Sequence, residues 1–374
     1  MLVLWIIAFI LAALYFIWIG LFYYGWAKIP SYSSMTCHER NFVSILIPAR
    51  NEEINLLGLL DNLIKQKYPQ NLIEIIVIDD HSSDLTEEIV EYFAKRNSNI
   101  RYVKLGNYEE GKKTALRKGV SAARFSYILT IDADCRPTPL WIRSMVDCFD
   151  KTRADLIAGP VVMKDDGGFF NRFQRLEFFS LLGSTAGSLG TGNPVMCSSA
   201  NLGFRKDAYM EVRNKNHREV SSGDDVFLLL AMHKTGRKKL LFLKSPDAYV
   251  TTRGENNLAG FLKQRQRWAS KSRYYNSTAS VFTAVLVFMI NLYASGCLFL
   301  GIFFNPFLLI AAFLFVIKSL IDFPFLFSVT SFFGEKKLMR FFIPVQIVYL
   351  FYVSFTAITA FTGVFDWKGR IVKN

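Results

Sequence analysis

The chain has 374 residues, with 44 Lys and Arg against 31 Asp and Glu, 51% hydrophobic residues and a mean hydropathy of +0.23. This composition excludes a disordered chain and a small secreted protein that depends on disulfides. The hydrophobic share exceeds what a soluble domain needs, so we expect part of the chain to lie in lipid.

The first 26 residues form an uninterrupted apolar segment. Residues 1–26 carry no charged side chain, and they exceed the ~20 residues with which a helix crosses a bilayer. The basic start, short apolar core and cleavage site of a signal peptide are not evident, so we expect an uncleaved transmembrane anchor. Lys28 follows it, and the positive-inside rule then predicts that the region 41–278 is cytoplasmic.

The region 41–278 begins with alternating strands and helices. Short β-branched runs predict strands at 43–47, 73–78, 101–105 and 127–131. Apolar periodicity and capping residues predict helices near 54–64, 83–95 and 113–123. This order is typical of an α/β fold with an open, mostly parallel sheet, helices on both faces, and ligands at the carboxyl ends of the strands.

Acidic side chains follow two of these strands. Asp79 and Asp80 end one strand, and Asp132 and Asp134 follow another. Aspartates are common in solvated turns, so either cluster alone is explained equally well as a turn. Two clusters at strand ends of one sheet favour a site, because an Asp-x-Asp pair can bind a divalent cation that also holds a diphosphate.

A competing signal lies between these two strands. Residues 106–114, GNYEEGKKT, nearly match the phosphate-loop pattern G-x-x-x-x-G-K-[ST]. However, Lys113 occupies the position of the metal-binding hydroxyl, and Glu109 and Glu110 place negative charge where phosphate would lie. An ATPase therefore remains as an alternative of another class, while Lys112 can contact a diphosphate in either case.

Two later motifs each have two interpretations. Asp224 and Asp225 precede an apolar helix, where they fit either an N-cap or a general base facing an acceptor hydroxyl. Gln264, Arg267 and Trp268 share one face of a predicted helix, at i, i+3 and i+4. A basic amphipathic helix on a membrane surface has the same composition, so a non-catalytic membrane scaffold is a further alternative.

The C-terminal region, 279–374, contains three apolar segments, near 279–304, 307–329 and 341–363. A basic loop, 336–340, separates the last two and suits the cytoplasmic side. A full third span would then place the basic tail outside, so we expect either an exception to the rule or a segment that is re-entrant or interfacial.

Seven motifs in order resemble membrane-bound glycosyltransferases of family 2, a group with ceramide and carotenoid glucosyltransferases and processive polysaccharide synthases. They are PARNE (48–52), DDHSSD (79–84), GK (111–112), DAD (132–134), NLGFR (201–205), GDD (223–225) and QRQRW (264–268). The likeness covers about 41–275. It implies a GT-A-like α/β fold, with transmembrane helices before and after it.

The resemblance also implies roles for individual residues. Mg²⁺ or Mn²⁺ would be held by Asp134 with Asp132, and Asp225 matches the catalytic base. Asn201, Asp224 and Trp268 would lie on the acceptor side. Donor binding is implied for Pro48, Ala49, Arg50, Glu52, Asp79, Lys112, Asp132, Gln264, Arg267 and Trp268.

These implications predict an inverting, metal-dependent glycosyltransferase. Its donor would be a nucleotide diphosphate sugar, with UDP-sugars favoured over GDP-sugars, and its acceptor a hydroxyl of a lipid or lipid-linked molecule. Processive polysaccharide synthesis is second, because such enzymes usually have more membrane spans. Membrane lipids are expected partners and nucleic acid is not. We expect an integral membrane protein of a bacterial inner membrane: an anchor at 1–26, a cytoplasmic catalytic domain at 41–278 that ends in an amphipathic interfacial helix, and a membrane region at 279–374.

Overall fold

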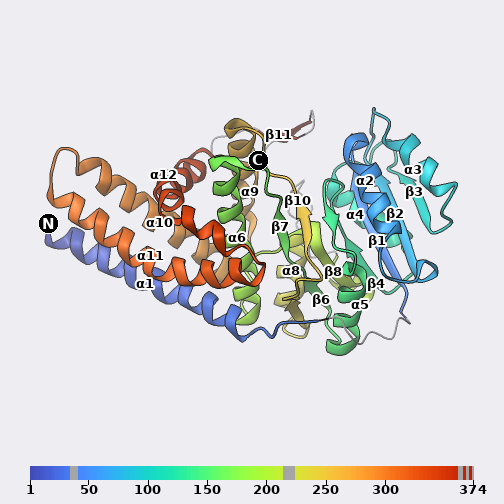
Figure 1. The fold of residues 1–374 in the computed structure, drawn as a ribbon, viewed down its shortest axis with the longest axis horizontal. Coiled ribbons are helices and arrows are strands. Elements are labelled where there is room, and N and C mark those ends of the chain that lie inside the picture. The colour runs from blue at the N-terminus through green and yellow to red at the C-terminus, as the bar shows by residue number, and fades with distance from the viewer. Residues whose placement is uncertain (34–40, 214–223, 361–364, 368–369, 373–374) are drawn as a thin grey trace.

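A computed structural model describes residues 1–33, 41–213, 224–360, 365–367 and 370–372. A mixed α/β region occupies one end of an elongated molecule, and a bundle of long helices occupies the other (Figure 1). The N-terminus lies at the far tip of this bundle.

The α/β region is built on a seven-stranded sheet in which only β8 runs antiparallel to its neighbours. Across the sheet the strands are β3 (Ile100–Lys104), β2 (Ile73–Asp79), β1 (Val43–Ala49), β4 (Tyr127–Thr130), β8 (Leu202–Arg205), β6 (Leu156–Ala158) and β9 (Leu240–Phe242). The predicted mostly parallel sheet is confirmed. Since the strand order reverses between β1 and β4, the ligand crevice is expected at their carboxyl ends.

Helices cover both faces of this sheet. Helices α2 (Glu53–Ile64) and α5 (Trp141–Thr152) share a buried core with Ile45 of β1, whereas α4 (Lys112–Ala122) shares the opposite core with Leu46. Successive side chains of a strand point to opposite faces, so a strand that is buried on both faces, such as β1, can serve two cores.

A second sheet of three strands lies beyond Asp134. Strand β10 (Val250–Thr252) pairs antiparallel with β5 (Arg136–Pro137) and parallel with β7 (Val161–Met163). The other elements are α3 (Thr86–Ala94), α6 (Gly168–Gly190), α7 (Lys206–Val212), α8 (Asp224–Lys234), α9 (Leu258–Ser270), β11 (Phe365–Trp367) and β12 (Arg370–Val372).

One buried carboxylate ties the strands of the first sheet together. Glu74 of β2 is fully buried and accepts hydrogen bonds from the Ser44 hydroxyl (2.8 Å), from Arg101 (2.6 Å) and from the Arg124 backbone (3.0 Å). Burial by itself raises the pKa of Glu74, but these bonds outweigh it and hold the pKa below the usual value. The carboxylate therefore stabilises the fold in its charged form.

Among the residues that the structure describes, four helical segments are long and apolar enough to cross a membrane. They are α1 (Leu2–Lys28), α10 (Thr278–Leu300), α11 (Pro306–Phe332), and Lys336–Ala360, in which the 3₁₀ turn η5 (Lys336–Phe341) continues into α12 (Phe342–Ala360). The predicted apolar segments fall on these helices, and residues 361–363 lie outside the described part.

Helix α6 packs against the first membrane helix with no side chain between the two backbones. A Cβ added to Gly187 would lie 2.2 Å from the carbonyl oxygen of Phe22, and one added to Gly25 would lie 2.0 Å from that of Gly187. Only glycine permits so close an approach. One continuous buried cluster also includes Phe22 of α1 and Leu46 of β1, so the membrane helix and the sheet share a core.

A buried carboxylate joins three helices inside the bundle. Asp322 of α11 accepts hydrogen bonds from the Tyr15 hydroxyl of α1 (2.8 Å), from Gln346 of α12 (2.7 Å) and from Lys318 one turn away (2.5 Å). A charge at membrane depth is expensive unless it is paired, so this cluster fixes how the three helices lie together.

The last apolar segment contacts the α/β region at both of its ends. Before η5, Glu335 lies 2.7 Å from Arg175 of α6. Near the end of α12, Thr359 accepts a hydrogen bond of 2.8 Å from Gln266 of α9. Figure 1 shows α12 beside α9, short of the bundle tip where the N-terminus lies.

Candidate active site

The carboxyl ends of β1 and β2 carry the first predicted donor residues. The parallel register aligns Ala49, the last residue of β1, with Asp79, the last residue of β2. Just beyond them, Arg50 Nη1 donates to the Asp80 carbonyl at 2.8 Å. Pro48, Ala49, Arg50 and Asp79 therefore lie together at the predicted edge of the sheet.

Two residues after the end of each strand lies a left-handed residue that is not glycine. Asn51 has φ of 50° and His81 has φ of 56°. The Asn51 backbone N–H donates to the Ser82 hydroxyl at 2.9 Å, and the Asn51 side chain accepts from the Ser83 backbone at 2.9 Å. These bonds offset the cost of the uncommon backbone conformation, so the two loops brace each other.

Asp79 is fully buried and bound within this braced region. Its carboxylate accepts from the Ser82 hydroxyl and, at 3.1 Å, from the Tyr102 hydroxyl. Both bonds orient the carboxylate, and its contact with a donor nucleotide stays a prediction.

A chain of polar contacts joins the second acidic cluster to the predicted catalytic base. Lys112 Nζ lies 2.6 Å from Asp132 Oδ1 and 2.8 Å from the Ser199 hydroxyl. The Ser199 backbone N–H donates to Asp225 Oδ2 at 2.9 Å. Helix α4, the end of β4 and the start of α8 thus bring Lys112, Asp132 and Asp225 to one place.

Arg267 faces the same acids from helix α9. Burial lowers the pKa of Arg267, while the negative charges of Asp132, Asp225 and Glu255 act in the opposite direction. A half-buried guanidinium between two site carboxylates is suited to stabilise a phosphate that leaves there.

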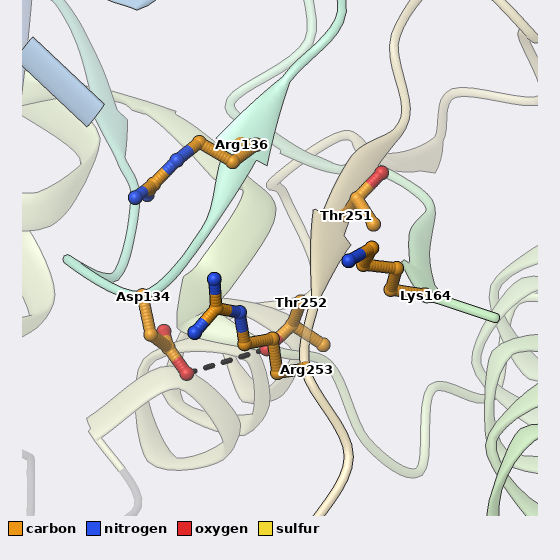
Figure 2. Close-up of a pocket in the computed structure, with 6 residues that line it drawn as sticks. All are labelled: Asp134, Arg136, Lys164, Thr251, Thr252 and Arg253. Atoms are coloured by element: carbon orange, nitrogen blue, oxygen red, sulfur yellow. Dashed lines mark hydrogen bonds between the residues drawn. The ribbon is translucent and has the colours of Figure 1, made fainter. Parts of the chain in front are cut away.

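Asp134 lies on the other side of Asp132. Its carboxylate accepts a hydrogen bond of 3.3 Å from Thr252 of β10 (Figure 2). Burial, followed by the charges of Asp132 and Glu52, raises the pKa of Asp134. Such a concentration of negative charge would be relieved by a cation.

The two aspartates fit a divalent cation that is shared with a substrate. No cluster of three His, Cys, Asp or Glu side chains suited to a metal occurs among the described residues. Mg²⁺ is commonly bound through one or two carboxylates together with substrate phosphates and water, so Asp132 and Asp134 suffice for that kind of site.

The remaining motif residues of α9 are held by hydrogen bonds, one ion pair and one cation–π contact. Gln264 donates to Glu255 at 2.8 Å and accepts from Arg265. The buried Arg265 pairs with Glu177 of α6, and its guanidinium lies 4.2 Å from the centre of the Trp268 ring. Arg265 therefore fixes helix α9 to α6, while Arg267 lies near Asp132 and Asp225.

Asn201 does not join this group. Its side chain is fully buried, donates to the Pro160 and Ala248 carbonyls at 2.8 Å each, and accepts from Trp141 at 2.8 Å. With its amide fully engaged, Asn201 supports the loops of the core instead of facing an acceptor. The side chain of Asp224 lies outside what the structure describes.

The phosphate-loop alternative loses its physical basis. The Glu109 carboxylate itself accepts from the Gly106 backbone at 2.9 Å and from Lys118 at 2.8 Å. Glu109 thus occupies the backbone donor that a phosphate would need, and Lys112 is directed to Asp132 instead.

Comparisons with known proteins agree with this geometry. Residues 44–213 match the family described as Glycosyl transferase family 2. Glycosyltransferase AglE of Haloferax volcanii is 27% identical over 183 residues, which are 49% of this chain and 59% of that protein. Poly-beta-1,6-N-acetyl-D-glucosamine synthase of Staphylococcus epidermidis is 26% identical over 243 residues, which are 61% of this chain and 53% of that protein. The chain thus spans little more than half the length of these curated relatives.

A solved structure extends the likeness to the membrane helices. The mannosyltransferase PcManGT of Pyrobaculum calidifontis, in complex with GDP-Man and Mn²⁺, has a TM-score of 0.55 and 16% sequence identity, and the match covers 95% of this chain and 99% of that one. This likeness concerns the fold, which is GT-A-like with helices long enough to span a membrane at both ends. The chain therefore contains a glycosyl transferase family 2 domain over residues 44–213.

Proposed function

We propose that this protein transfers a sugar from a nucleotide diphosphate sugar to a hydroxyl group of a lipid or lipid-linked acceptor, with inversion at the anomeric carbon. The observation that carries the proposal is the contact chain from Lys112 and Asp132 through Ser199 to Asp225, with Arg267 opposite. It supports a role for one general base and two cations at a shared reaction centre.

Asp225 accepts the proton of the acceptor hydroxyl as that oxygen bonds to the anomeric carbon. The bond from this carbon to the diphosphate breaks in the same step, and Arg267 and Lys112 stabilise the negative charge that the diphosphate acquires. A divalent cation held by Asp132 and Asp134 would neutralise the same diphosphate. With one base and one displacement, the sugar inverts.

The site faces the cytoplasm in this proposal. Lys28 at the end of α1 and the basic residues of η5 lie at the catalytic end of the bundle, which is the side where the positive-inside rule puts cations. Both ends of Lys336–Ala360 contact the α/β region, so the basic C-terminal tail begins on the same side.

Nucleotide binding to detergent-purified protein tests the proposal. With Mn²⁺ present, UDP or GDP should bind more tightly than ATP, and Asp134→Ala should weaken that binding. Asp61→Asn, in an exposed ion pair of α2, is the matched control and should bind like the wild type. Preference for ATP, or no nucleotide binding at all, would overturn the proposal.

A second experiment separates catalysis from binding. Asp225→Asn should abolish transfer while it leaves nucleotide affinity unchanged, because Asp225 acts on the acceptor proton. A fully active variant would refute the assignment. Since one relative is a poly-N-acetylglucosamine synthase, product length should also be measured, and long polymers would favour processive synthesis.

A further inference from the structure

A pocket of about 180 Å³ lies beside Asp134 (Figure 2). It is lined by Asp134, Arg136, Lys164, Thr251, Thr252 and Arg253. Half of these side chains are cations, and Asp134 is the only acid among them. The sequence motifs did not single out Arg136, Lys164 or Arg253.

The three-stranded sheet brings these cations together. Strands β7 and β10 are parallel, so the residues that follow them, Lys164 and Arg253, emerge at the same edge, and the Lys164 backbone donates to Thr252 at 2.9 Å. Strand β5 runs the other way and begins there with Arg136. In Figure 2 the Arg253 side chain extends to the side of Asp134.

The positive charge of this pocket is poorly compensated. The Arg136 guanidinium donates to the neutral backbone carbonyls of Cys135 (2.7 Å) and Asn55 (2.8 Å). Lys164 is 3.1 Å from Asp166, but this pair is exposed and weak. In the described ranges of the chain, no ion pair joins Arg253 to a carboxylate.

The donor does not account for this charge. Its diphosphate is already served by Lys112 and Arg267 on the Asp132 side and by the cation that Asp132 and Asp134 would share. The pocket belongs to the second sheet, and its strand β10 leads within a few residues to α9, whose Gln266 bonds to Thr359 of α12. It therefore lies between the reaction centre and the apolar helices.

We propose that this pocket binds a phosphate group of the acceptor, so that the acceptor is a phosphorylated lipid; this inference rests on the proposed function. A phosphate monoester has almost two negative charges and three acceptor oxygens. It can therefore pair with several cations at once, whereas a ligand with a single carboxylate has only one negative charge. Arg253 and Lys164 hold the phosphate, and Arg136 adds a third positive charge.

The test compares acceptor-like probes with the nucleotide on the detergent-purified, full-length protein. Farnesyl phosphate is the probe, farnesol is its neutral match, and inorganic phosphate reports the anion alone. The wild type should bind farnesyl phosphate at least about tenfold more tightly than either farnesol or phosphate. Arg253→Ala should weaken the binding of farnesyl phosphate about tenfold. Its affinity for UDP or GDP in the presence of Mn²⁺ should stay within about twofold of the wild-type affinity. Arg253→Lys should recover part of the loss.

Controls make each outcome decisive. Arg253 is exposed, so its variants should unfold at the wild-type temperature, and Arg237→Ala, a distant exposed arginine, should bind all probes like the wild type. Equal loss of nucleotide and farnesyl phosphate in Arg253→Ala would assign the pocket to the donor and overturn the proposal. Equal binding of farnesyl phosphate and farnesol, or of farnesyl phosphate and inorganic phosphate, would also overturn it. Absent nucleotide binding in the wild type would instead refute the proposed function.

Discussion

Replacement of Gly187 by alanine tests whether α1 and α6 are held backbone to backbone. The new Cβ would lie 2.2 Å from the Phe22 carbonyl oxygen, whereas real Cβ contacts stay above 3.0 Å, so the helices must separate by about 0.8 Å. Because the clashing atom is backbone, no side-chain rotation relieves it. Overpacking of this kind costs about 1–3 kcal/mol.

The expected change in melting temperature follows from chain length. With an unfolding entropy of about 2.1 cal/mol/K per residue, a chain of 374 residues loses roughly 1.3 °C per kcal/mol. Gly187→Ala should therefore lower the Tm by about 1–4 °C in a thermal scan of the detergent-purified protein.

Gly296→Ala is the matched control, because it lies in membrane helix α10 and its Cβ would meet nothing within 4 Å. Alanine is the better helix former, so this variant should melt at or slightly above the wild-type temperature. If the two variants melted at the same temperature, the close packing of α1 on α6 would be wrong.

Three further outcomes can be measured on the same preparation. Glu177→Gln leaves Arg265 buried without its counter-charge and should lower the free energy of unfolding by about 3–5 kcal/mol in denaturant titrations, whereas Glu91→Gln, in an exposed pair, should change it by less than about 1 kcal/mol. Asn201→Ala should lower the Tm and leave the KM values for donor and acceptor unchanged. A rise in the KM for the acceptor alone would show that Asn201 belongs to the acceptor site. The pKa of Glu74 is lower in the folded protein than in the unfolded chain, where it is ~4.3. The charged carboxylate therefore stabilises the fold above that pH, and this contribution is lost as the pH falls through the folded pKa. Glu74→Gln should therefore melt earlier than the wild type at pH 7 and lose less stability on acidification below about pH 5, and parallel curves would contradict this reasoning.

The strands and their acidic ends could be predicted because their signals are local. Apart from Ser44 and Glu74, the runs at 43–47 and 73–78 are apolar on both faces, which is typical of a strand buried between two layers. Asp79 and Asp132 then follow from strand geometry alone. The long apolar helices were equally predictable, since length and composition indicate them.

Other features depend on contacts between distant parts of the chain. Ser199 links Lys112 to Asp225 through one hydroxyl and one backbone N–H, and nothing in its sequence neighbourhood indicates this. The burial of Asn201 could not be predicted either, because a polar motif does not say whether a side chain faces a ligand or the core. The contact of Gly187 with Phe22 could not be predicted, because the two residues lie far apart in the chain.

The direct contact between α1 and α6 limits how the catalytic region can move. At Gly25 and Gly187 no side chain separates the backbones of α1 and α6. The hydroxyl of Tyr352 in α12 also donates a hydrogen bond to Glu177 of α6 at 2.9 Å. A catalytic domain on a flexible linker can reach acceptors at many distances from the bilayer. A domain held by two rigid helix contacts can reach them at one distance. Under the proposed function, such a mounting would hold the reaction centre at one distance from the bilayer, and acceptor hydroxyls at other distances would not be glycosylated.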